Sequence, residues 1–187
     1  MNAIKGMTDI LLRRNPKTEQ IEYLNGIKES SAALLVIIND ILDISKIEAD
    51  KIDLEHIPFS IKEVLENVDI IMRFKTEEKG LELKTVVPDN IPNVIGDPHR
   101  LRQILINLLG NGIKFTELGS ITTAIELLPT QNKDTLNVHF TISDTGIGIP
   151  EDQHKHIFEA FMQSKGQDHA KYGGTGLGLA ITKRLVE

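Results

Sequence analysis

The sequence predicts an α+β protein in which a helical hairpin precedes an α/β sandwich. Up to residue 48, apolar side chains recur mostly at three- and four-residue spacing, which is typical of amphipathic helices. After about residue 50, the pattern mixes helical spacing with the apolar-polar alternation of strands. The 187 residues, of which 40% are hydrophobic, are enough for one packed domain with a short appended element.

Two helices account for the N-terminal part of the chain. The first covers about 2–14 and ends at an Asn15-Pro16 break, and the second covers 18–48, with Ser31 inside its apolar stripe. Periodicity alone favours two helices of an ordinary helical core. Because two helices cannot enclose a core by themselves, we expect a homodimer in which these helices form a four-helix bundle. Their apolar positions are Ile4, Met7, Ile10, Leu11, Ile21, Leu24, Ile27, Leu34, Leu35, Ile37, Ile38, Ile41, Leu42 and Ile44.

The remaining pattern predicts helices and strands that would form the sandwich. Pro58 and Ser60 introduce a helix over about 60–79, with Ser60 as its N-cap and Gly80 as its stop. Asp97-Pro98 opens another helix, which runs to about Asn111. Strands are expected at 81–87, 119–128 and 135–143, the last of which alternates Leu136, Val138, Phe140 and Ile142 with polar residues.

Composition and charge exclude several classes of protein. The net charge of −6 and the sequence pI near 5.5 argue against nucleic acid as a partner. No apolar run approaches the roughly 20 residues of a membrane span, so no membrane segment is expected in this chain. The absence of cysteine excludes a disulfide framework and fits a cytoplasmic location. It leaves open whether a longer parent protein is anchored in a membrane.

Two glycine-rich segments point to a polyanionic ligand. They are Asp144-Thr145-Gly146-Ile147-Gly148-Ile149-Pro150 and Gly173-Gly174-Thr175-Gly176-Leu177-Gly178. Glycines let backbone amides approach phosphate groups closely, and amides at a helix N-terminus favour negative charge. Neither segment matches a P-loop or a Rossmann fingerprint. We therefore expect a nucleotide site of another kind.

Polar residues in two places suggest how that site could work. Asn107 and Asn111 lie on one face of the predicted helix, with Lys114 about one turn further on. Amide oxygens can bind Mg²⁺, and a lysine can meet phosphate charge. Asp144 follows a predicted strand and can accept a hydrogen bond from an exocyclic amine, which favours adenine. Taken singly, these residues also fit solvent-facing asparagines and an ordinary aspartate turn.

Four short segments occur in a fixed order along the chain. They are Asn107-x-x-x-Asn111-x-x-Lys114-Phe115-Thr116, residues 144–150, Phe158-Glu159-Ala160-Phe161 and Gly174-Thr175-Gly176-Leu177-Gly178-Leu179. In this order they resemble the N, G1, F and G2 boxes of sensor histidine kinases. The resemblance implies a Bergerat-type α/β sandwich (HATPase, GHKL class) that uses ATP and Mg²⁺. It also implies phosphoryl transfer to a histidine and relay to an aspartate of a response-regulator receiver domain.

The same resemblance assigns domains and roles. Residues 1–50 become the dimerisation and histidine-phosphotransfer helices, and residues 51–187 become the catalytic ATP-binding domain. Asn111 becomes the Mg²⁺ ligand, and residues 151–173 become the lid over ATP. By the same resemblance, Asn107 supports the metal or the phosphates, Lys114 contacts phosphate and Asp144 recognises adenine. Gly146 and Gly148 shape the base pocket, and Phe158 and Phe161 anchor the lid. The triphosphate is bordered by Gly174, Thr175, Gly176, Leu177 and Gly178.

The chain departs from the family pattern at both ends. In the family, the phosphoacceptor histidine lies just before a stretch like Met1-Asn2-Ala3-Ile4, so we expect the acceptor to be absent from this chain. None of the six histidines has the acceptor's sequence context. A metal site at His154 and His156 is not expected, because residues two apart on a helix point in different directions. The family continues with further strands after Glu187, so the catalytic domain is expected to be incomplete at its C-terminus.

Residue 107 separates the alternative functions. Related ATPases of the gyrase, Hsp90 and MutL types place a glutamate at this position as the base that activates water, and the amide of Asn107 cannot accept that proton. Phosphoryl transfer to a protein is therefore favoured over ATP hydrolysis. Two alternatives stay open: a non-catalytic dimerisation or nucleotide-binding module, and, less favoured, a GHKL-type ATPase.

Overall fold

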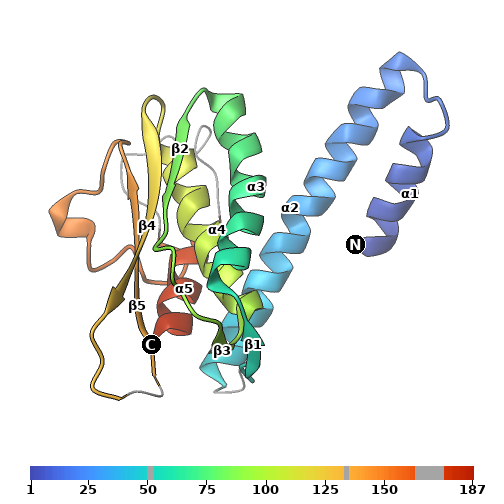
Figure 1. Cartoon of the computed structure of the whole chain (residues 1–187). Coiled ribbons are helices and arrows are strands. Elements are labelled where there is room, and N and C mark those ends of the chain that lie inside the picture. Colours follow the sequence, from blue (N-terminus) through green and yellow to red (C-terminus); the bar gives the residue numbers. More distant parts are fainter. Residues whose placement is uncertain (50–52, 133–134, 163–174) are drawn as a thin grey trace. The chain divides into compact units, whose positions relative to one another are not determined.

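The computed structural model describes residues 1–49, 53–132, 135–162 and 175–187. It forms two compact units, Met1–Lys51 and Ile52–Glu187 (Figure 1). The first unit is helical, and the second combines helices with two sheets. The predicted fold class, a helical region followed by an α/β domain, is confirmed.

The first unit is a helical hairpin of α1 (Asn2–Leu12) and α2 (Thr18–Glu48). An ion pair of 2.8 Å joins Asp9 of α1 to Lys28 of α2. The hydrogen bond from Lys28 lowers the pKa of Asp9 below its ordinary value. The first helix ends two residues earlier than predicted, because Asn15 adopts a left-handed φ of 51° before Pro16, which disfavours helical geometry in the residue that precedes it.

The hairpin buries little of its apolar surface. Thr8 and Ser31 are its buried residues within the described part of the chain, and the position of Ser31 fits the predicted stripe. An open groove of about 750 Å³ runs along the two helices between Ile4, Ile27 and Leu34. Several apolar side chains on both helices are exposed: Ile4, Met7, Ile10, Leu11, Ile21, Ile27, Leu34, Val36, Ile37, Ile38, Ile41 and Leu42.

The second unit contains two sheets and the remaining helices. A small antiparallel sheet pairs β1 (Ile57–Phe59) with β3 (Val94–Gly96). The larger sheet has the order β2-β4-β5, with β2 (Glu82–Val86) parallel to β4 (Ser120–Leu128) and β5 (Asn137–Asp144) antiparallel to β4. The helical elements are α3 (Ile61–Lys79), α4 (Pro98–Phe115), the 3₁₀ turn η1 (Glu151–Gln153) and α5 (Gly178–Val186).

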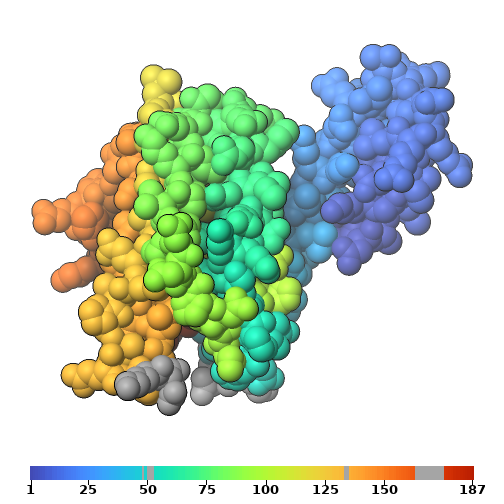
Figure 2. Space-filling view, in the orientation of Figure 1, coloured from blue at the N-terminus to red at the C-terminus, as the bar shows by residue number. Residues whose placement is uncertain are grey.

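The core of this unit lies between the larger sheet and the helices α3 and α4, which cover one face of that sheet (Figure 1). On the face shown in Figure 2, α3, β2 and β4 lie side by side. The predicted alternation is visible in β5, where Val138, Phe140 and Ile142 are half-buried between exposed neighbours. In β4, Ile121, Thr123 and Ile125 are buried. The core residues are Ile61, Val64, Leu65, Val68, Met72, Leu81, Leu105, Leu109, Ile113, Ile121 and Ile125.

Local signals located α3 correctly. The hydroxyl of Ser60 accepts a hydrogen bond from the backbone N–H of Glu63, and Gly80 ends the helix with a left-handed φ of 69°. The predicted N-cap and stop are both confirmed. The short strands β1 and β3 were not predicted, because each is three residues long and gains its hydrogen bonds from a segment far away in the sequence.

The predicted end of α4 was wrong by one turn. The helix continues past Asn111 to Phe115. Gly112 does not break it, because this residue is buried against Ile121 and Asp144. Lys79 at the end of α3 stabilises the extra turn from outside. Its ammonium group donates to the carbonyls of Ile113 at 2.7 Å and Lys114 at 3.1 Å, where a cation meets the negative end of the helix dipole.

Candidate functional site

Helix α4 carries the three predicted catalytic residues, and Asp97 fixes where it begins. One carboxylate oxygen of Asp97 accepts hydrogen bonds from the backbone N–H groups of His99 at 2.9 Å and Arg100 at 3.0 Å. The other accepts from Glu55 N–H at 3.1 Å. Burial raises the pKa of Asp97, but the hydrogen bonds from Arg100, Glu55 and His99 lower it to below its ordinary value overall.

Asn107 is held by the helix that follows the second glycine-rich segment. Its side-chain Nδ2 donates a hydrogen bond of 2.7 Å to the hydroxyl of Thr182 in α5. A Cβ at Gly178, the first residue of α5, would overlap the amide oxygen of Asn107. The structure therefore brings two predicted site residues, Asn107 and Gly178, into direct contact.

Asn111 and Lys114 lie further along α4 and are both partly buried. Among the described residues, the side chain of Asn111 has no hydrogen-bond partner, and Lys114 has no carboxylate within ion-pair distance. The ammonium group of Lys114 lies 4.6 Å from the centre of the Phe115 ring. Burial lowers the pKa of Lys114, because it removes water from around the charged ammonium group. Both side chains keep their polar atoms available for a ligand.

The first glycine-rich segment rests on the C-terminal end of α4. Asp144 ends β5, and its Oδ1 accepts a hydrogen bond of 2.8 Å from the N–H of Gly146. A Cβ at Gly146 would lie 2.5 Å from the carbonyl oxygen of Phe115, so only glycine allows this approach. The N–H of Ile147 donates to the same carbonyl at 3.4 Å. Within the described residues, the second carboxylate oxygen of Asp144 has no hydrogen bond.

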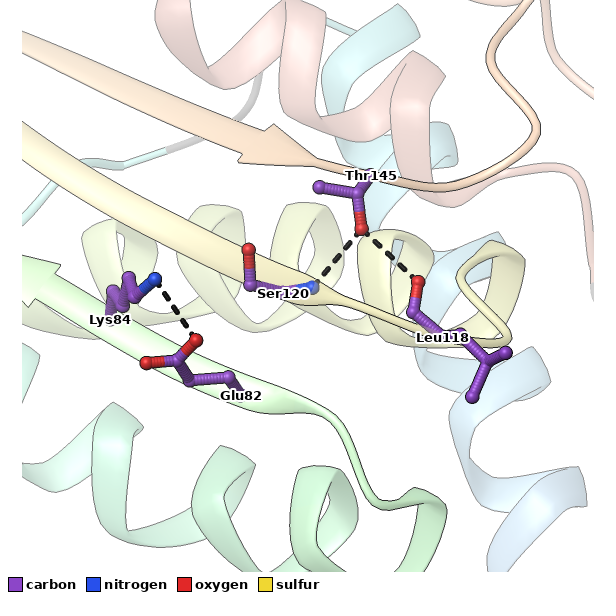
Figure 3. Close-up of polar contacts among 5 residues, drawn as sticks. All are labelled: Glu82, Lys84, Leu118, Ser120 and Thr145. Atoms are coloured by element: carbon purple, nitrogen blue, oxygen red, sulfur yellow. Dashed lines mark hydrogen bonds and ion pairs between the residues drawn. The ribbon is translucent and has the colours of Figure 1, made fainter.

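Thr145 fixes this segment to the turn before β4, as Figure 3 shows. Its hydroxyl accepts a hydrogen bond of 3.0 Å from the N–H of Ser120 and donates one of 3.2 Å to the carbonyl of Leu118. A Cβ at Gly119, between them, would overlap the Thr145 hydroxyl. The neighbouring β2 carries a surface ion pair of 2.9 Å, from Glu82 to Lys84. The loop after Asp144 is thus held by α4 on one side and by this turn on the other.

The F and G2 segments also meet in the structure. The N–H of Phe161 donates a hydrogen bond of 3.0 Å to the carbonyl of Gly176, which has a left-handed φ of 70°. The hydroxyl of Thr175 accepts a hydrogen bond from Leu177 N–H at 3.2 Å, and Leu177 is buried. Phe158 and Phe161 are exposed, 38% and 68%, so neither is a core residue.

A metal at this site would depend on few protein ligands. Within the described ranges, no group of three or more His, Asp or Glu residues could hold an ion. The Nε2 of His154 lies 2.9 Å from the Ile149 carbonyl oxygen, and the Nδ1 of His156 lies 2.8 Å from the Glu159 carboxylate. The free amide of Asn111 suits an ion that keeps its waters and binds phosphate oxygens, as Mg²⁺ does.

Comparison with known families accounts for this arrangement. The model of the histidine kinase-, DNA gyrase B- and HSP90-like ATPases matches residues 96–187, and the model of the His Kinase A (phospho-acceptor) domain matches residues 1–50. Together they cover well over half of the chain. This chain belongs to the histidine kinase family.

Individual histidine kinases are similar over the whole chain. The signal transduction histidine-protein kinase BarA of Escherichia coli K12 is 44% identical over 187 residues, and the sensory/regulatory protein RpfC of Xanthomonas campestris is 39% identical over 188. The match covers 100% of this chain in both cases, but only 20% of BarA and 26% of RpfC. This chain therefore spans about a quarter or less of the length of these relatives.

Solved histidine kinase structures have the same fold. Full-length ShkA in complex with AMPPNP superposes with a TM-score of 0.79 at 35% identity, covering 98% of this chain and 37% of ShkA. The catalytic domain of ThkA superposes with a TM-score of 0.59 at 29% identity, covering 71% of this chain and 80% of that domain. No helix in the described part of this histidine kinase is long and apolar enough to cross a membrane.

Two residues that hold this site together were not predicted. Thr182 follows the apolar run Leu179-Ala180-Ile181 and lies four residues after Gly178, and this spacing could have shown that it shares a face with that glycine. Lys79 gave no comparable signal, because the carbonyls that it contacts lie more than 30 residues further along the chain. Gly174 and residues 163–173 of the predicted lid lie outside the described residues.

Proposed function

We propose that this chain is the ATP-binding kinase core of a two-component sensor histidine kinase. It would transfer the γ-phosphoryl group of ATP to a histidine, from which a response-regulator aspartate receives it. One observation carries the proposal: the loop Asp144–Gly148 is bonded to the carbonyl at the end of α4, which bears the free side chains of Asn111 and Lys114. This contact supports the proposal, because it holds the loop that carries the proposed base-binding carboxylate against the helix that carries the proposed phosphate-binding groups.

Asp144 would recognise the base. Its Oδ1 is used by the Gly146 N–H, which fixes the plane of the carboxylate. The remaining oxygen can accept a hydrogen bond from the exocyclic amine of adenine. Guanine carries a carbonyl oxygen at the equivalent position, and an ionised carboxylate cannot donate to it. The proposal therefore includes a preference for ATP over GTP.

Asn111 and Lys114 would bind the phosphate end. The amide oxygen of Asn111 is the proposed ligand of Mg²⁺, together with phosphate oxygens and water. When bound, Mg²⁺ supplies positive charge that offsets the charge on the transferring phosphoryl group. Lys114 adds a second positive charge, and a bound phosphate would raise its lowered pKa towards the ordinary value. The segment Thr175–Gly178, which includes Gly176 and Gly178, would border the triphosphate.

Asn107 supports transfer over hydrolysis. Its amide cannot act as a general base, and its Nδ2 is already engaged by Thr182. Without a base at position 107 to activate water, the proposed reaction depends on positioning and charge neutralisation, which suits a nucleophile that another segment delivers. All six histidines lie outside α1 and α2, so we propose that the acceptor histidine is supplied by a segment not included in these 187 residues.

The helical hairpin would supply dimerisation. Its apolar face is exposed in the single chain, and two copies could bury these faces against each other as a four-helix bundle. The groove along Ile4, Ile27 and Leu34 has the apolar lining that a partner helix requires. A receiver domain of a response regulator is the proposed second partner, and neither nucleic acid nor a membrane is proposed.

Calorimetric titration of Mg·ATP into the purified chain tests the site. We expect saturable binding that weakens on the order of 10- to 100-fold in Asn111→Ala and in Asp144→Ala, because each loses a contact to a charged or buried group. Asn67→Ala and Asp89→Ala, at exposed positions on α3 and after β2, are the matched controls and should bind like the wild type. Absence of binding by the folded wild-type chain would rule the proposal out.

A second assay separates the three functions. The chain is incubated with Mg·ATP labelled at the γ-phosphate and with an added protein that bears a histidine phosphoacceptor segment. Acid-labile label on that protein supports the kinase. Release of free phosphate without labelling would instead support a GHKL-type ATPase, and ATP binding with neither product would leave a nucleotide-binding module.

A further inference from the structure

Thr182 occupies a position that the proposed nucleotide chemistry does not use. It lies on the second turn of α5, its side chain is buried with 6% exposure, and its hydroxyl accepts the 2.7 Å hydrogen bond from Asn107 Nδ2. The two residues are separated by 75 positions in the sequence. Breaking the hydrogen bond between a buried hydroxyl and a partly buried amide costs free energy, because each group is then left without a hydrogen-bond partner.

This bond determines how the amide of Asn107 is oriented. An amide has one donor end and one acceptor end, so engagement of Nδ2 by Thr182 directs Oδ1 to the opposite side. Oδ1 lies against Gly178, where any Cβ would overlap it. The amide plane is therefore held between the hydroxyl of Thr182 and the first residue of α5.

The same bond connects the segments that would surround the triphosphate. Thr182 and Gly178 are one turn apart on α5, and Thr175–Leu177 of the second glycine-rich segment directly precede this helix. Gly176 in that segment accepts the hydrogen bond from Phe161. Asn107 thus joins α4 to α5, and α5 leads back through Gly176 to the predicted lid anchor.

We propose that Thr182 is a positioning residue for the nucleotide site. Its hydroxyl sets the orientation of the Asn107 amide and keeps the start of α5, with the glycine-rich segment before it, against α4. This inference rests on the proposed function, because the effect to be measured is on Mg·ATP. It adds a residue outside the four motif segments, and it predicts that a change confined to a buried hydroxyl alters nucleotide affinity.

The test replaces the hydroxyl while preserving the shape of the side chain. Thr182→Val should weaken Mg·ATP binding about tenfold by calorimetry, which corresponds to the loss of one buried hydrogen bond. Thr182→Ser keeps the hydroxyl and should bind within about threefold of the wild type. Thr123→Val is the matched control: Thr123 is fully buried in β4 and its hydroxyl has no partner among the described residues, so its affinity should not change.

A double-mutant cycle gives a readout that loss of packing would not produce. In an Asn107→Ala background, Thr182→Val should weaken binding by less than about twofold, because the partner of the hydroxyl is already absent. Thr182→Ala, which removes volume without overpacking, is measured in the same way should the valine variant fail to fold. Folding of every variant is checked by circular dichroism before titration.

The outcomes distinguish this inference from the function on which it rests. Equal affinities for Thr182→Val and Thr123→Val, with binding still lost in Asp144→Ala, would overturn the positioning role and leave the nucleotide site standing. Effects of Thr182→Val and Asn107→Ala that simply add would also overturn it. Absence of Mg·ATP binding by the wild type would overturn both.

Discussion

The two units of this chain use the same kind of apolar periodicity for different ends. In the second unit, apolar residues from α3, α4 and β4 are buried to between 0% and 6% exposure. In the described part of the first unit, the buried residues are Thr8 and Ser31, both polar, whereas Met7, Val36 and other apolar residues are exposed. Periodicity thus identifies a face that must be covered, and it does not show whether the same chain covers it.

The difference indicates where each unit obtains its stability. The second unit removes its apolar side chains from water within a single chain, at about 25 cal/mol per Å² of buried apolar area. The first unit leaves a comparable stripe open, and an isolated pair of helices gains little from it. We therefore expect that the hairpin depends on a second copy, while the catalytic unit does not.

Negative charge among the exposed apolar side chains of α2 should have the largest effect of the substitutions considered, and this effect should be on dimerisation. In the double variant Ile27→Asp and Leu34→Asp, two carboxylates would have to be buried without partners in a dimer. We expect the dimer to weaken by on the order of 100-fold or more, as measured by analytical ultracentrifugation over a range of protein concentrations. Mg·ATP binding by the second unit should persist.

A matched control separates the effect of the position of the charge from the effect of losing an exposed apolar side chain. Ile70 on α3 is 71% exposed, more than Ile27 at 46% or Leu34 at 44%, but it lies in the second unit. Ile70→Asp should leave the oligomeric state unchanged. If this variant dissociated the dimer and the double variant did not, the comparison between the units would have to be reversed.

Loss of a core side chain should give the next largest effect, confined to the second unit. Leu109 on α4 is fully buried, so Leu109→Ala should lower the free energy of unfolding of this unit by about 2–5 kcal/mol through lost burial and a cavity. Leu118→Ala, at 81% exposure in the same unit, should change it by less than about 0.5 kcal/mol. Urea titration followed by NMR signals from β4 separates this unit from the hairpin. Equal effects of the two substitutions would contradict the assignment of the core.

The sequence predicted features whose causes are local. Ser60 and Gly80 bound α3 because a side-chain acceptor and a residue free of Cβ act on their own neighbours in the chain. The change from helical to alternating apolar periodicity near residue 50 predicted the fold class, which is confirmed. The order of the four motif segments indicated the family, and the roles of the single site residues stay predictions.

Features that depend on distant partners were missed or misplaced. The strand β1 exists because Pro58 lies opposite Ile95 of β3, and neither segment has a strand signal of its own. The end of α4 was placed at Asn111, since the ammonium group that caps its last turn comes from Lys79 on another helix. Thr182 was not singled out because its partner, Asn107, lies 75 residues before it.

The ends of the helices extend the comparison to a smaller scale. At the start of α2, the side chain of Gln20 accepts a hydrogen bond from the N–H of Lys17, whereas α4 begins with the carboxylate of Asp97 bonded to two N–H groups of its first turn. Asp97→Ala should lower the stability of the second unit by about 1 kcal/mol near pH 7. The pKa of Asp97 in the folded state is lower than its ordinary value of 3.8, so folding favours the ionised form.

The pH dependence of this N-cap follows from the direction in which folding shifts the pKa of Asp97. Its contribution is fully present above the unfolded value of 3.8 and is lost as the pH falls through the lower folded pKa. The wild type and Asp97→Ala should therefore differ in urea midpoint at pH 7 and at pH 5, and should converge as the pH falls below about 3.8. Asp97→Asn keeps an acceptor at the N-cap but cannot titrate there, so its advantage over Asp97→Ala should persist at low pH. A gap between wild type and Asp97→Ala that did not narrow in acid would mean that Asp97 stabilises α4 by shape alone and not by its charge.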